Sequence, residues 1–389
     1  MSDTLLVTSI VRVSGTGESS GFVRWVSMKE RRVLKTWPIL ESRFRQYDLN
    51  PRGGLRGGRG LGCTADRFVI AMTDRLYVFD RQWNQVAELS HPLFGEVHDI
   101  LVEPDGVWVT ATASDALIKL GWDGRLLRSW SWRKDAGLAE ALGLAAWAGE
   151  AAEVDYRDPR QLPPLYDFVH INGVARAPEG LLLSFGFVAS GATRRFQSLL
   201  GLPGRVLKGM GMDTPLAKPS RMFAMRFLGA RYSSATWLGV LLPDDGPARI
   251  VARQEGVKIP NHNLTWNEDA LVFNDTHSSQ LVSQKLDGSG RRQATIPGTP
   301  RAFARGLAPL GGQRFIVGSQ CPTALYEVDL HSGRSELLCK LGDNVHECVY
   351  AVHAVPDTFG EPPEQLWSSA APPVDVAVDE GPRAVAVGN

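Results

Sequence analysis

The sequence has few cysteines, no long apolar run and no excess of charge of either sign. The four cysteines form no CxxC pair, which disfavours a disulfide framework or a zinc knuckle (Cys63, Cys321, Cys339 and Cys348). Lys and Arg together number 42, and so do Asp and Glu, so the chain lacks the basic field that nucleic-acid binding needs. No run of about 20 apolar residues occurs, and the N-terminus lacks the pattern of a signal peptide. We therefore expect a soluble, cytoplasmic protein without a transmembrane segment.

Common catalytic motifs are also missing. The sequence contains no GxSxG, no Walker loop and no HExxH, so it does not support the usual serine-hydrolase, nucleotide-binding or zincin functions. No nucleotide cofactor is expected. The 40 glycines and 24 prolines instead indicate a chain that turns often.

One unit of sequence recurs six times. Each copy opens with a polar residue before a short apolar strand, and three more strands follow, separated by tight turns. The openings are 39, 43 and 41 residues apart where no insertion intervenes and 72 and 92 apart where one does (Arg59, His98, His170, His262, Arg305 and His346). A period of about 40 residues with four short strands is typical of a β-propeller blade.

The two ends of the chain complete one blade. Residues 5–40 contain three predicted strands and residues 346–355 contain one, so pairing them would close the ring and remove its open edges. We predict an all-β, six-bladed propeller formed by a single domain at residues 1–355, although a degenerate seventh blade is compatible with the insertions. Residues 356–389 are rich in Pro, Ala and acidic residues, which predicts a disordered tail.

Two long insertions interrupt the repeat. The first, residues 131–168, contains an Ala/Leu-rich stretch that predicts one helix. The second, residues 190–232, is basic, and its Gly and Pro residues argue against a long amphipathic helix. We favour a lid over the channel, and a funnel for anionic substrate, a membrane-surface contact and a protein contact remain open.

The residues that open the blades are the candidate site. The first strand of each blade lines the central channel, so these side chains are expected to converge. Four of the eight histidines are among them, and imidazole favours a transition metal such as Fe(II) or Zn(II) (His98, His170, His262 and His346). Arg59 and Arg305 are predicted to hold and orient an anionic group of the substrate and to take part in catalysis.

Four further polar residues are candidates around these positions. The turn after His170 comes two residues late, which places Asn172 level with the other openings. Asn172 and Asn263 are therefore predicted to bind substrate. Asp99 and Glu347 each follow a histidine and are considered as acceptors that orient imidazoles, although adjacent strand residues normally face opposite sides. The competing interpretation is that all these side chains merely line a water-filled channel.

At the level of its repeats, the chain resembles six-bladed propellers of the SMP-30/gluconolactonase and NHL-repeat superfamily. The segments HINGVA (170–175), PNHNLTWNEDALVFNDTHSSQL (260–281) and ARGLAPLGGQRFIVGSQ (304–320) are similar to motifs of an uncharacterised bacterial propeller family. That family brings no known reaction. Calcium-dependent lactonases of the superfamily use Glu, Asn and Asp ligands, whereas this chain has histidines at the corresponding places. The peptide-amidating lyase and the carotenoid cleavage oxygenases, which use axial histidines, are closer in ligand type.

Three functions remain open from the sequence. The first is a metal-dependent enzyme acting on an anionic small molecule, with lyase, oxygenase and hydrolase chemistry unresolved. The second is a non-catalytic propeller that binds a ligand or partner. The third and weakest is a calcium-dependent, lactonase-like hydrolase.

Overall fold

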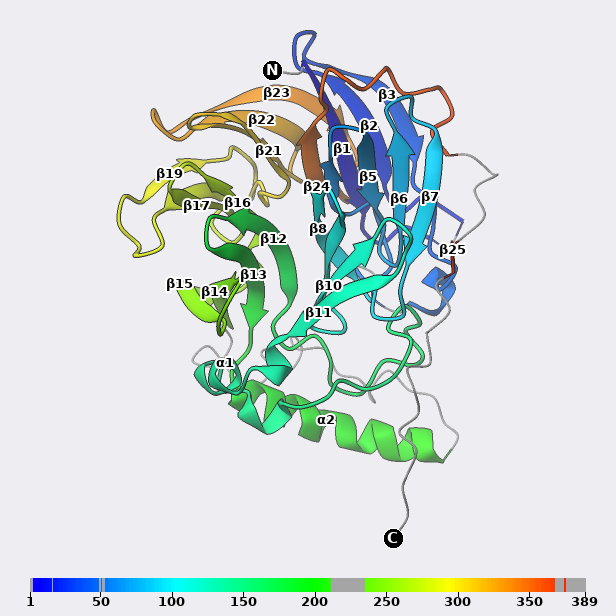
Figure 1. The fold of residues 1–389 in the computed structure, drawn as a ribbon, viewed down its shortest axis with the longest axis vertical. Helices are drawn as coiled ribbons and strands as arrows, with labels where there is room; N and C mark the ends of the chain where they lie inside the picture. Colours follow the sequence, from blue (N-terminus) through cyan, green and yellow to red (C-terminus); the bar gives the residue numbers. More distant parts are fainter. Residues whose placement is uncertain are drawn as a thin grey trace.

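Six β-sheets are arranged radially around a central axis in the computed structural model (Figure 1). The structure describes residues 3–15, 17–48, 50, 53–210, 235–367 and 374–375. Each sheet contains four antiparallel strands, and one of them gains the short strand β25 (Val374–Asp375), which pairs in parallel with β7. The predicted six-bladed propeller is confirmed within the described residues.

The five blades formed from consecutive strands follow one another along the chain. They consist of β4 (Leu61–Cys63), β5 (Arg67–Ala71), β6 (Leu76–Asp80) and β7 (Gln85–Ser90); β8 (Val97–Glu103), β9 (Gly106–Ala111), β10 (Ala116–Gly121) and β11 (Leu126–Ser131); β12 (Ile171–Ala177), β13 (Gly180–Val188), β14 (Ala235–Pro243) and β15 (Arg249–Val257); β16 (His262–Asn267), β17 (Ala270–Asp275), β18 (Gln280–Gln284) and β19 (Arg292–Thr295); and β20 (Leu307–Gly311), β21 (Arg314–Gly318), β22 (Thr323–Asp329) and β23 (Arg334–Gly342).

The sixth blade joins the two ends of the chain, as predicted. Its strand order is β24 (Glu347–Ala354), β1 (Thr4–Val11), β2 (Phe22–Ser27) and β3 (Arg32–Pro38). Leu5 lies opposite Ala354 and Val11 lies opposite Glu347 in the pairing of β1 with β24. This pairing satisfies the backbone groups of two strands that would otherwise be exposed edges.

The outermost strand of each blade is less buried than the two middle strands. All six residues of β9 are buried, whereas four of the six residues of the outermost strand β11 are exposed. Apolar side chains of adjacent sheets pack against each other between the blades. Trp237 and Phe273, from neighbouring sheets, stack with ring centroids 4.2 Å apart. The innermost strands also contact their neighbours in order around the ring, which brings their first residues together.

Three of the innermost strands begin with an irregularity in their pairing. The register shifts between Val97 and Ile100 in β8, between Ile171 and Gly173 in β12, and between His262 and Leu264 in β16. His170 and Asn263 have positive φ values of 53° and 49°. Bulges of this kind re-aim side chains next to a site, and each of these three lies beside one of the axial histidines.

The first insertion contains a much shorter helix than predicted. Helix α1 spans only Ala136–Ala141, and short 3-10 turns lie at Trp132–Lys134 and Ala145–Trp147. Gly143 adopts φ 67°, and the Leu144 N–H donates to the Ala139 carbonyl. This arrangement ends a helix because the left-handed residue turns the chain away from the helix axis. The sequence periodicity predicted a longer helix because it took no account of Gly143.

The second insertion does begin with a long helix, contrary to prediction. Helix α2 (Gly191–Gly209) lies with α1 at one side of the propeller (Figure 1). Pro203 is exposed within it, so the missing backbone hydrogen bond faces solvent. Three large apolar side chains of the helix are also exposed, and so is Met210 directly after it (Leu199, Leu202 and Val206 in the helix). The predicted lid, funnel and partner contacts fall largely on residues 211–234, outside the described residues, and stay predictions.

The start of the predicted disordered tail is packed against the propeller. Phe359 and Leu366 are buried, and the indole N–H groups of Trp83 and Trp37 donate to the carbonyls of Gly360 and Glu364. Residues 356–367 therefore belong to the folded domain. The Pro-rich composition predicted disorder because it does not show that Phe359 and Leu366 pack against aromatic side chains of the propeller.

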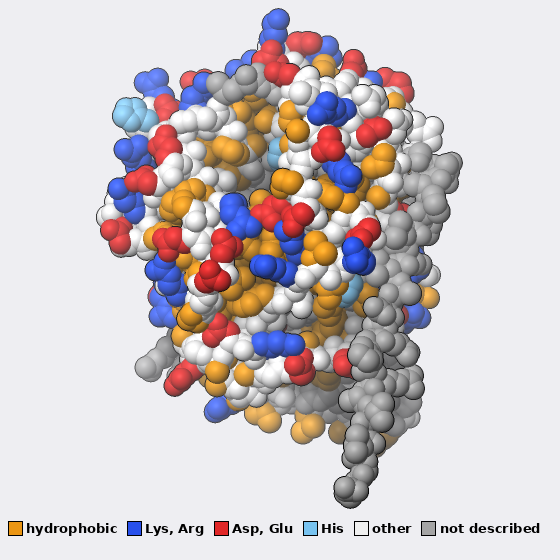
Figure 2. Space-filling view, viewed as in Figure 1, with side chains coloured by type: hydrophobic (Ala, Val, Ile, Leu, Met, Phe, Trp, Pro, Cys, Tyr) orange, Lys and Arg blue, Asp and Glu red, His pale blue; other side chains and the backbone are white. Residues whose placement is uncertain are grey.

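The surface carries charges of both signs. Figure 2 shows Lys and Arg side chains interspersed with Asp and Glu, with apolar side chains between them. Among the described helices, none is both long enough and apolar enough to span a bilayer.

Candidate metal centre

Three histidines from three consecutive blades meet at the axis. His98 lies in β8, His170 directly precedes β12, and His262 begins β16. One ring nitrogen from each lies within 4.8 Å of those from the other two. The rings of His98 and His170 are 4.8 Å apart at their centroids, and those of His98 and His262 are 6.4 Å apart. The convergence predicted for these three residues is present.

Threonine hydroxyls fix the orientation of His98 and His262. Nδ1 of His98 lies 2.8 Å from the Glu96 carbonyl, which can only accept, and 2.8 Å from the Thr112 hydroxyl, which donates its own proton to the Ile171 carbonyl. The Thr276 hydroxyl likewise donates to the Ala304 carbonyl and accepts from Nδ1 of His262 at 2.9 Å. The proton of each imidazole is thereby assigned to Nδ1, and the lone pair to Nε2.

The carboxylate of Asp167 orients the ring of His170 in the same way. Nδ1 of His170 lies 3.1 Å from the nearer carboxylate oxygen of Asp167, three residues earlier. A carboxylate accepts a hydrogen bond, so the proton of His170 also belongs on Nδ1 and its lone pair on Nε2. Carboxylate–histidine pairs of this kind fix the ring and raise the basicity of the other nitrogen toward a metal.

The protein favours the neutral forms of His98 and His262. Only 7% of His98 and 5% of His262 are exposed. Burial lowers the pKa of His98 well below its usual value, and the adjacent His170 and the Arg59 and Arg305 charges lower it further. Burial, followed by the charges of Arg305 and the other two histidines, does the same to the pKa of His262. At neutral pH both rings are uncharged, as metal ligands must be.

The donor set fits a divalent transition ion. Imidazole nitrogens suit zinc, iron and copper, whereas calcium takes oxygen ligands. Three imidazoles whose Nδ1 atoms already have acceptors within the protein present three Nε2 lone pairs for coordination. The structure thus provides three nitrogen ligands together with the hydrogen bonds that hold them.

The fourth predicted ligand, His346, does not join this group. Its side chain is exposed, and its backbone N–H donates to the Asn344 side chain. Strand β24 starts only at Glu347, and the buried residues that follow include Cys348 and Tyr350. The ring of Tyr350 lies 5.7 Å from that of His98. The blade closed by both chain ends therefore contributes a tyrosine near the axis in place of the predicted histidine.

The two predicted arginines lie together on the other side of the axis. Their guanidinium carbons are 4.4 Å (Arg59) and 3.5 Å (Arg305) from the centroid of the Tyr350 ring. A third arginine, Arg12, lies 4.4 Å from the centroid of Phe303, and that ring lies 6.1 Å from the ring of His262. Such contacts between cations and aromatic faces hold the planar guanidinium groups in place.

Arg59 and Arg305 are buried and Arg12 is partly buried, and none of the three has a carboxylate partner within the described part of the chain. Arg59 is 1% exposed and Arg305 is 5% exposed. Among the described residues, none of Arg12, Arg59 and Arg305 forms an ion pair, and their Nε atoms have no hydrogen-bond acceptor. Burial lowers the pKa of Arg305 to about 10, and the charges of Arg59 and Arg12 act in the same direction. The group remains cationic at neutral pH, which costs several kcal/mol for a buried charge of this kind.

The other predicted polar residues form hydrogen bonds or ion pairs within the propeller. The Asn172 amide donates to the Asn261 carbonyl, and the Asn263 side-chain oxygen accepts from the Gly306 N–H. Asp99 accepts from the backbone N–H of Ile100, and burial raises its pKa to about 7. Glu347 is paired with Arg24 inside the closing blade. Asn172 and Asn263 thus connect neighbouring strands, and neither Asp99 nor Glu347 orients an imidazole.

Two residues of the site that were not predicted from the sequence have a regular spacing from the histidines. Thr112 and Thr276 each lie 14 residues after the histidine that they contact. A hydroxyl residue occupies the same position after the other three openings of the unbroken blades (Thr73 after Arg59, Ser184 after His170 and Ser319 after Arg305). This regularity could have predicted the two threonines. Asp167, Arg12 and Tyr350 have no counterpart in the repeat.

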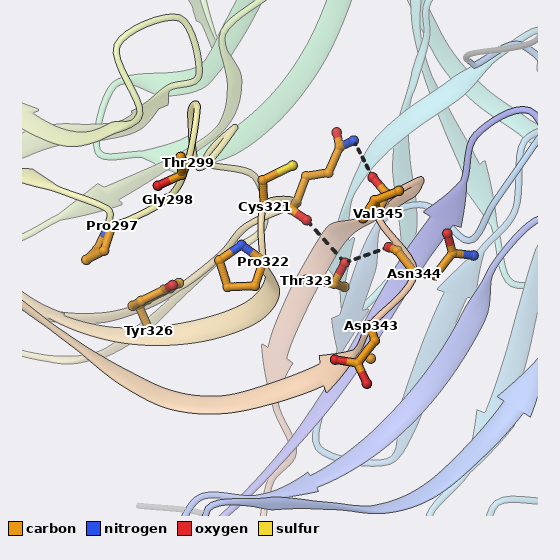
Figure 3. A pocket seen from close by; sticks show the side chains of 12 residues that line it. Pro297, Gly298, Thr299, Cys321, Pro322, Thr323, Tyr326, Asp343, Asn344 and Val345 are labelled. Atoms are coloured by element: carbon orange, nitrogen blue, oxygen red, sulfur yellow. Dashed lines mark hydrogen bonds between the residues drawn. The ribbon is translucent and has the colours of Figure 1, made fainter.

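A separate surface pocket lies away from these residues. It has a volume of about 410 Å³ and is formed by three loops, residues 297–299, 320–323 and 342–345, together with Tyr326 (Figure 3). Its lining includes one acid, Asp343, and one thiol, Cys321, but neither an axial histidine nor an axial arginine. The chemistry-bearing residues are concentrated at the axis, so we place the candidate site there.

Solved structures with the same general architecture are distant in sequence. A structure of streptogramin B lyase is 11% identical over 74% of this chain and 70% of that one, with a TM-score of 0.42. A chain of the nidogen/laminin complex is 9% identical over 90% and 98%, with a TM-score of 0.49. A protein of unknown function from Bacteroides caccae is 10% identical over 91% and 98%, with a TM-score of 0.48. At these levels the matches do not bear on activity.

No family model and no curated protein matches the chain. The resemblance to an uncharacterised bacterial family therefore stays a prediction. The propeller assignment rests on the sheets themselves, and the candidate site rests on the side chains at the axis.

Proposed function

We propose that the chain is a metal-dependent enzyme that acts on an anionic small molecule at the propeller axis. The observation that carries the proposal is the convergence of three histidines whose Nδ1 atoms all have acceptors within the protein. His98, His170 and His262 would hold Fe(II) or Zn(II) through Nε2. A divalent ion with three neutral ligands keeps its full charge, so it would supply Lewis-acid or redox chemistry.

The surrounding residues have distinct parts in this proposal. Thr112, Thr276 and Asp167 keep the lone pairs of the imidazoles directed inward. Arg59 and Arg305 bind the anionic group of the substrate across the axis from the histidines. Burial of both groups excludes bulk water and strengthens their electrostatic interactions with a substrate. Lyase, hydrolase and oxygenase reactions all fit this arrangement.

Metal analysis of the full-length protein tests the proposal. The protein is stripped with a chelator and reloaded with Zn(II), with Fe(II) without oxygen, or with Ca(II). We expect one tightly bound transition ion per chain and no competition from Ca(II). Turnover of small anionic compounds should disappear on stripping and return on reloading. A stripped protein that binds no added transition ion at micromolar concentration would contradict the proposal, and activity that needs Ca(II) would favour the lactonase-like alternative.

A second candidate is a non-catalytic propeller that binds a partner. The exposed apolar side chains of α2 favour it, because exposed apolar patches often mark interaction surfaces. It predicts that the axial histidines are replaceable, whereas Leu202→Ser with Val206→Ser abolishes partner binding. Cosedimentation with anionic lipid vesicles tests the membrane-surface form of this function. Binding of the wild type but not of the double variant would support it.

A further inference from the structure

Two aromatic rings organise the cationic side of the axis. The guanidinium carbons of Arg59 and Arg305 both lie within 4.4 Å of the centroid of one ring, that of Tyr350. Arg12 lies over the neighbouring ring of Phe303. Because two of the cations share a single ring, their charges are concentrated around one point. Two separate ligand groups would need cations that are spread apart.

This side of the site offers donors without acceptors. The Nε–H groups of Arg12, Arg59 and Arg305 have no acceptor among the described residues, and neither has the proton of the Tyr350 hydroxyl, which lies beside the Arg59 side chain. One guanidinium is partly engaged, because Nη2 of Arg59 donates to the Gly54 carbonyl at 2.6 Å. Other arginines of the described residues also have an Nε without an acceptor, but Arg45, Arg56 and Arg133 each form an ion pair with a carboxylate. Buried arginines without such a pair are rare in native proteins, so Arg59 and Arg305 point to an anionic ligand.

The phenol of Tyr350 adds a neutral donor to the three cations. A phenol is protonated at neutral pH, so the buried hydroxyl of Tyr350 can donate a hydrogen bond to an anion. A phenolate would instead have neutralised one of the arginines.

The charge and the number of donors indicate the class of ligand. One carboxylate has two oxygens and is already matched by one guanidinium. A phosphoryl group has three accepting oxygens and a charge of about −1.5 to −2 at pH 7, which suits two guanidinium groups over one ring, a third at the neighbouring ring and a hydroxyl. We propose that Arg12, Arg59, Arg305 and Tyr350 form a phosphoryl-binding site. The enzyme's substrate is then a phosphorylated small molecule, a conclusion that rests on the proposed function.

Binding of inorganic phosphate to the metal-stripped, full-length protein tests the site directly. Isothermal titration calorimetry should give one phosphate per chain, bound at least about tenfold more tightly than acetate or succinate. Arg305→Met and Arg12→Met should each weaken phosphate binding by about tenfold or more, since each removes charge-assisted hydrogen bonds. Tyr350→Phe, which keeps the ring under both cations, should weaken binding severalfold. Arg301→Met removes an equal charge from an exposed position and should have no effect.

Thermal unfolding checks that the variants are folded. Saturating phosphate should raise the unfolding midpoint of the wild type by at least about 2 °C and leave that of Arg305→Met unchanged. The proposal is overturned if acetate or succinate binds as tightly as phosphate, or if Arg301→Met weakens binding as much as Arg305→Met. Phosphate binding that appears only after a metal is added would also overturn it, because the anion would then sit on the ion.

Metal analysis of the same variants separates the two proposals. His98→Ala should lose the metal and bind phosphate like the wild type, whereas Arg305→Met should keep the metal. Metal binding without any phosphate binding would leave the enzyme proposal intact and defeat the phosphoryl site. Phosphate binding without metal binding would do the reverse.

Discussion

The two halves of the propeller axis have the same architecture, but they present opposite kinds of polar group to the axis. Three consecutive blades, which start with β8, β12 and β16, contribute histidines whose polar atoms are directed by hydrogen bonds within the protein. The other three blades contribute arginines and a tyrosine whose donors lack acceptors. The histidine half directs three Nε2 lone pairs toward a cation, and burial keeps His98 and His262 uncharged. The arginine half is cationic and prepared for an anion.

The comparison teaches that burial alone does not define a binding site. Arg24 is as deeply buried as Arg305, but it is paired with Glu347 and so contributes to the closing blade. Arg305 has no such partner among the described residues. What distinguishes the two arginines is whether the protein itself supplies the opposite charge. Substitutions in the two halves should therefore have different effects on metal binding and on stability.

Loss of one axial imidazole should abolish tight metal binding. His98→Ala is expected to lower the affinity for Zn(II) by at least about a thousandfold, because changes in outer contacts alone cost about 10–100-fold. His346→Ala, which removes an exposed histidine with the same opening position in the repeat, should retain wild-type affinity. Competition against a chromogenic chelator measures both. Equal loss in the two variants would contradict the three-histidine centre.

Replacing a buried arginine that has a carboxylate partner and replacing one that has none should change the free energy of unfolding in different directions. Arg24→Met leaves Glu347 as an uncompensated buried charge, so the free energy of unfolding should fall by about 3–5 kcal/mol. Arg305→Met removes a charge that has no partner, so the same quantity should stay equal or rise by about 1–3 kcal/mol. Urea denaturation in phosphate-free buffer measures both. A loss of stability in Arg305→Met similar to that in Arg24→Met would show that Arg305 has a structural role.

The threonine beside His262 should matter less than the histidine itself. Thr276→Val keeps the side-chain shape but removes the acceptor for Nδ1, and the affinity for Zn(II) should fall by about 10–100-fold. Thr276→Ser restores the hydroxyl and should restore most of the affinity. Chelator competition in the two variants separates the hydrogen bond from packing. If valine and serine behave alike, the hydroxyl does not support the site.

The two halves should be weakly coupled. A bound dianion partly offsets the cations that face the metal, so phosphate should raise the affinity for Zn(II) by about fivefold, and Zn(II) should raise the affinity for phosphate equally. Titrations at free Zn(II) concentrations set by a chelator buffer measure this coupling. Arg305→Met should abolish it. Phosphate that weakens Zn(II) binding in the wild type would mean that the anion and the ion do not share the axis as proposed.

Much of the architecture was predictable from the sequence. The openings at Arg59, His98, His262 and Arg305 share one period, and a period of this length corresponds to one blade. The closing of the ring followed from three strands at one end of the chain and one at the other. Ring closure then required His98, His170 and His262 to converge, because the first strand of every blade lies at the axis.

Errors arose where local context outweighed the repeat. His346 has the right spacing, but it lies in an exposed turn before β24, where its backbone N–H donates to the Asn344 side chain. The predicted long helix in the first insertion ends at Gly143, whose left-handed backbone conformation stops it. Residues 356–367 look disordered by composition, and they are ordered because Phe359 and Leu366 find apolar surface to cover.

The sequence by itself determined the period, the number of blades and the identity of the residues that open them. Only the tertiary structure decided which of these residues face one another and which partners they have. Asp167 and Thr276 orient imidazoles, Tyr350 lies beneath two arginines, and Asn172 and Asn263 are engaged in the framework. The physical reason is that a repeat specifies backbone hydrogen bonds and apolar faces. The pairing of individual charges depends on side chains brought together from blades far apart in the chain.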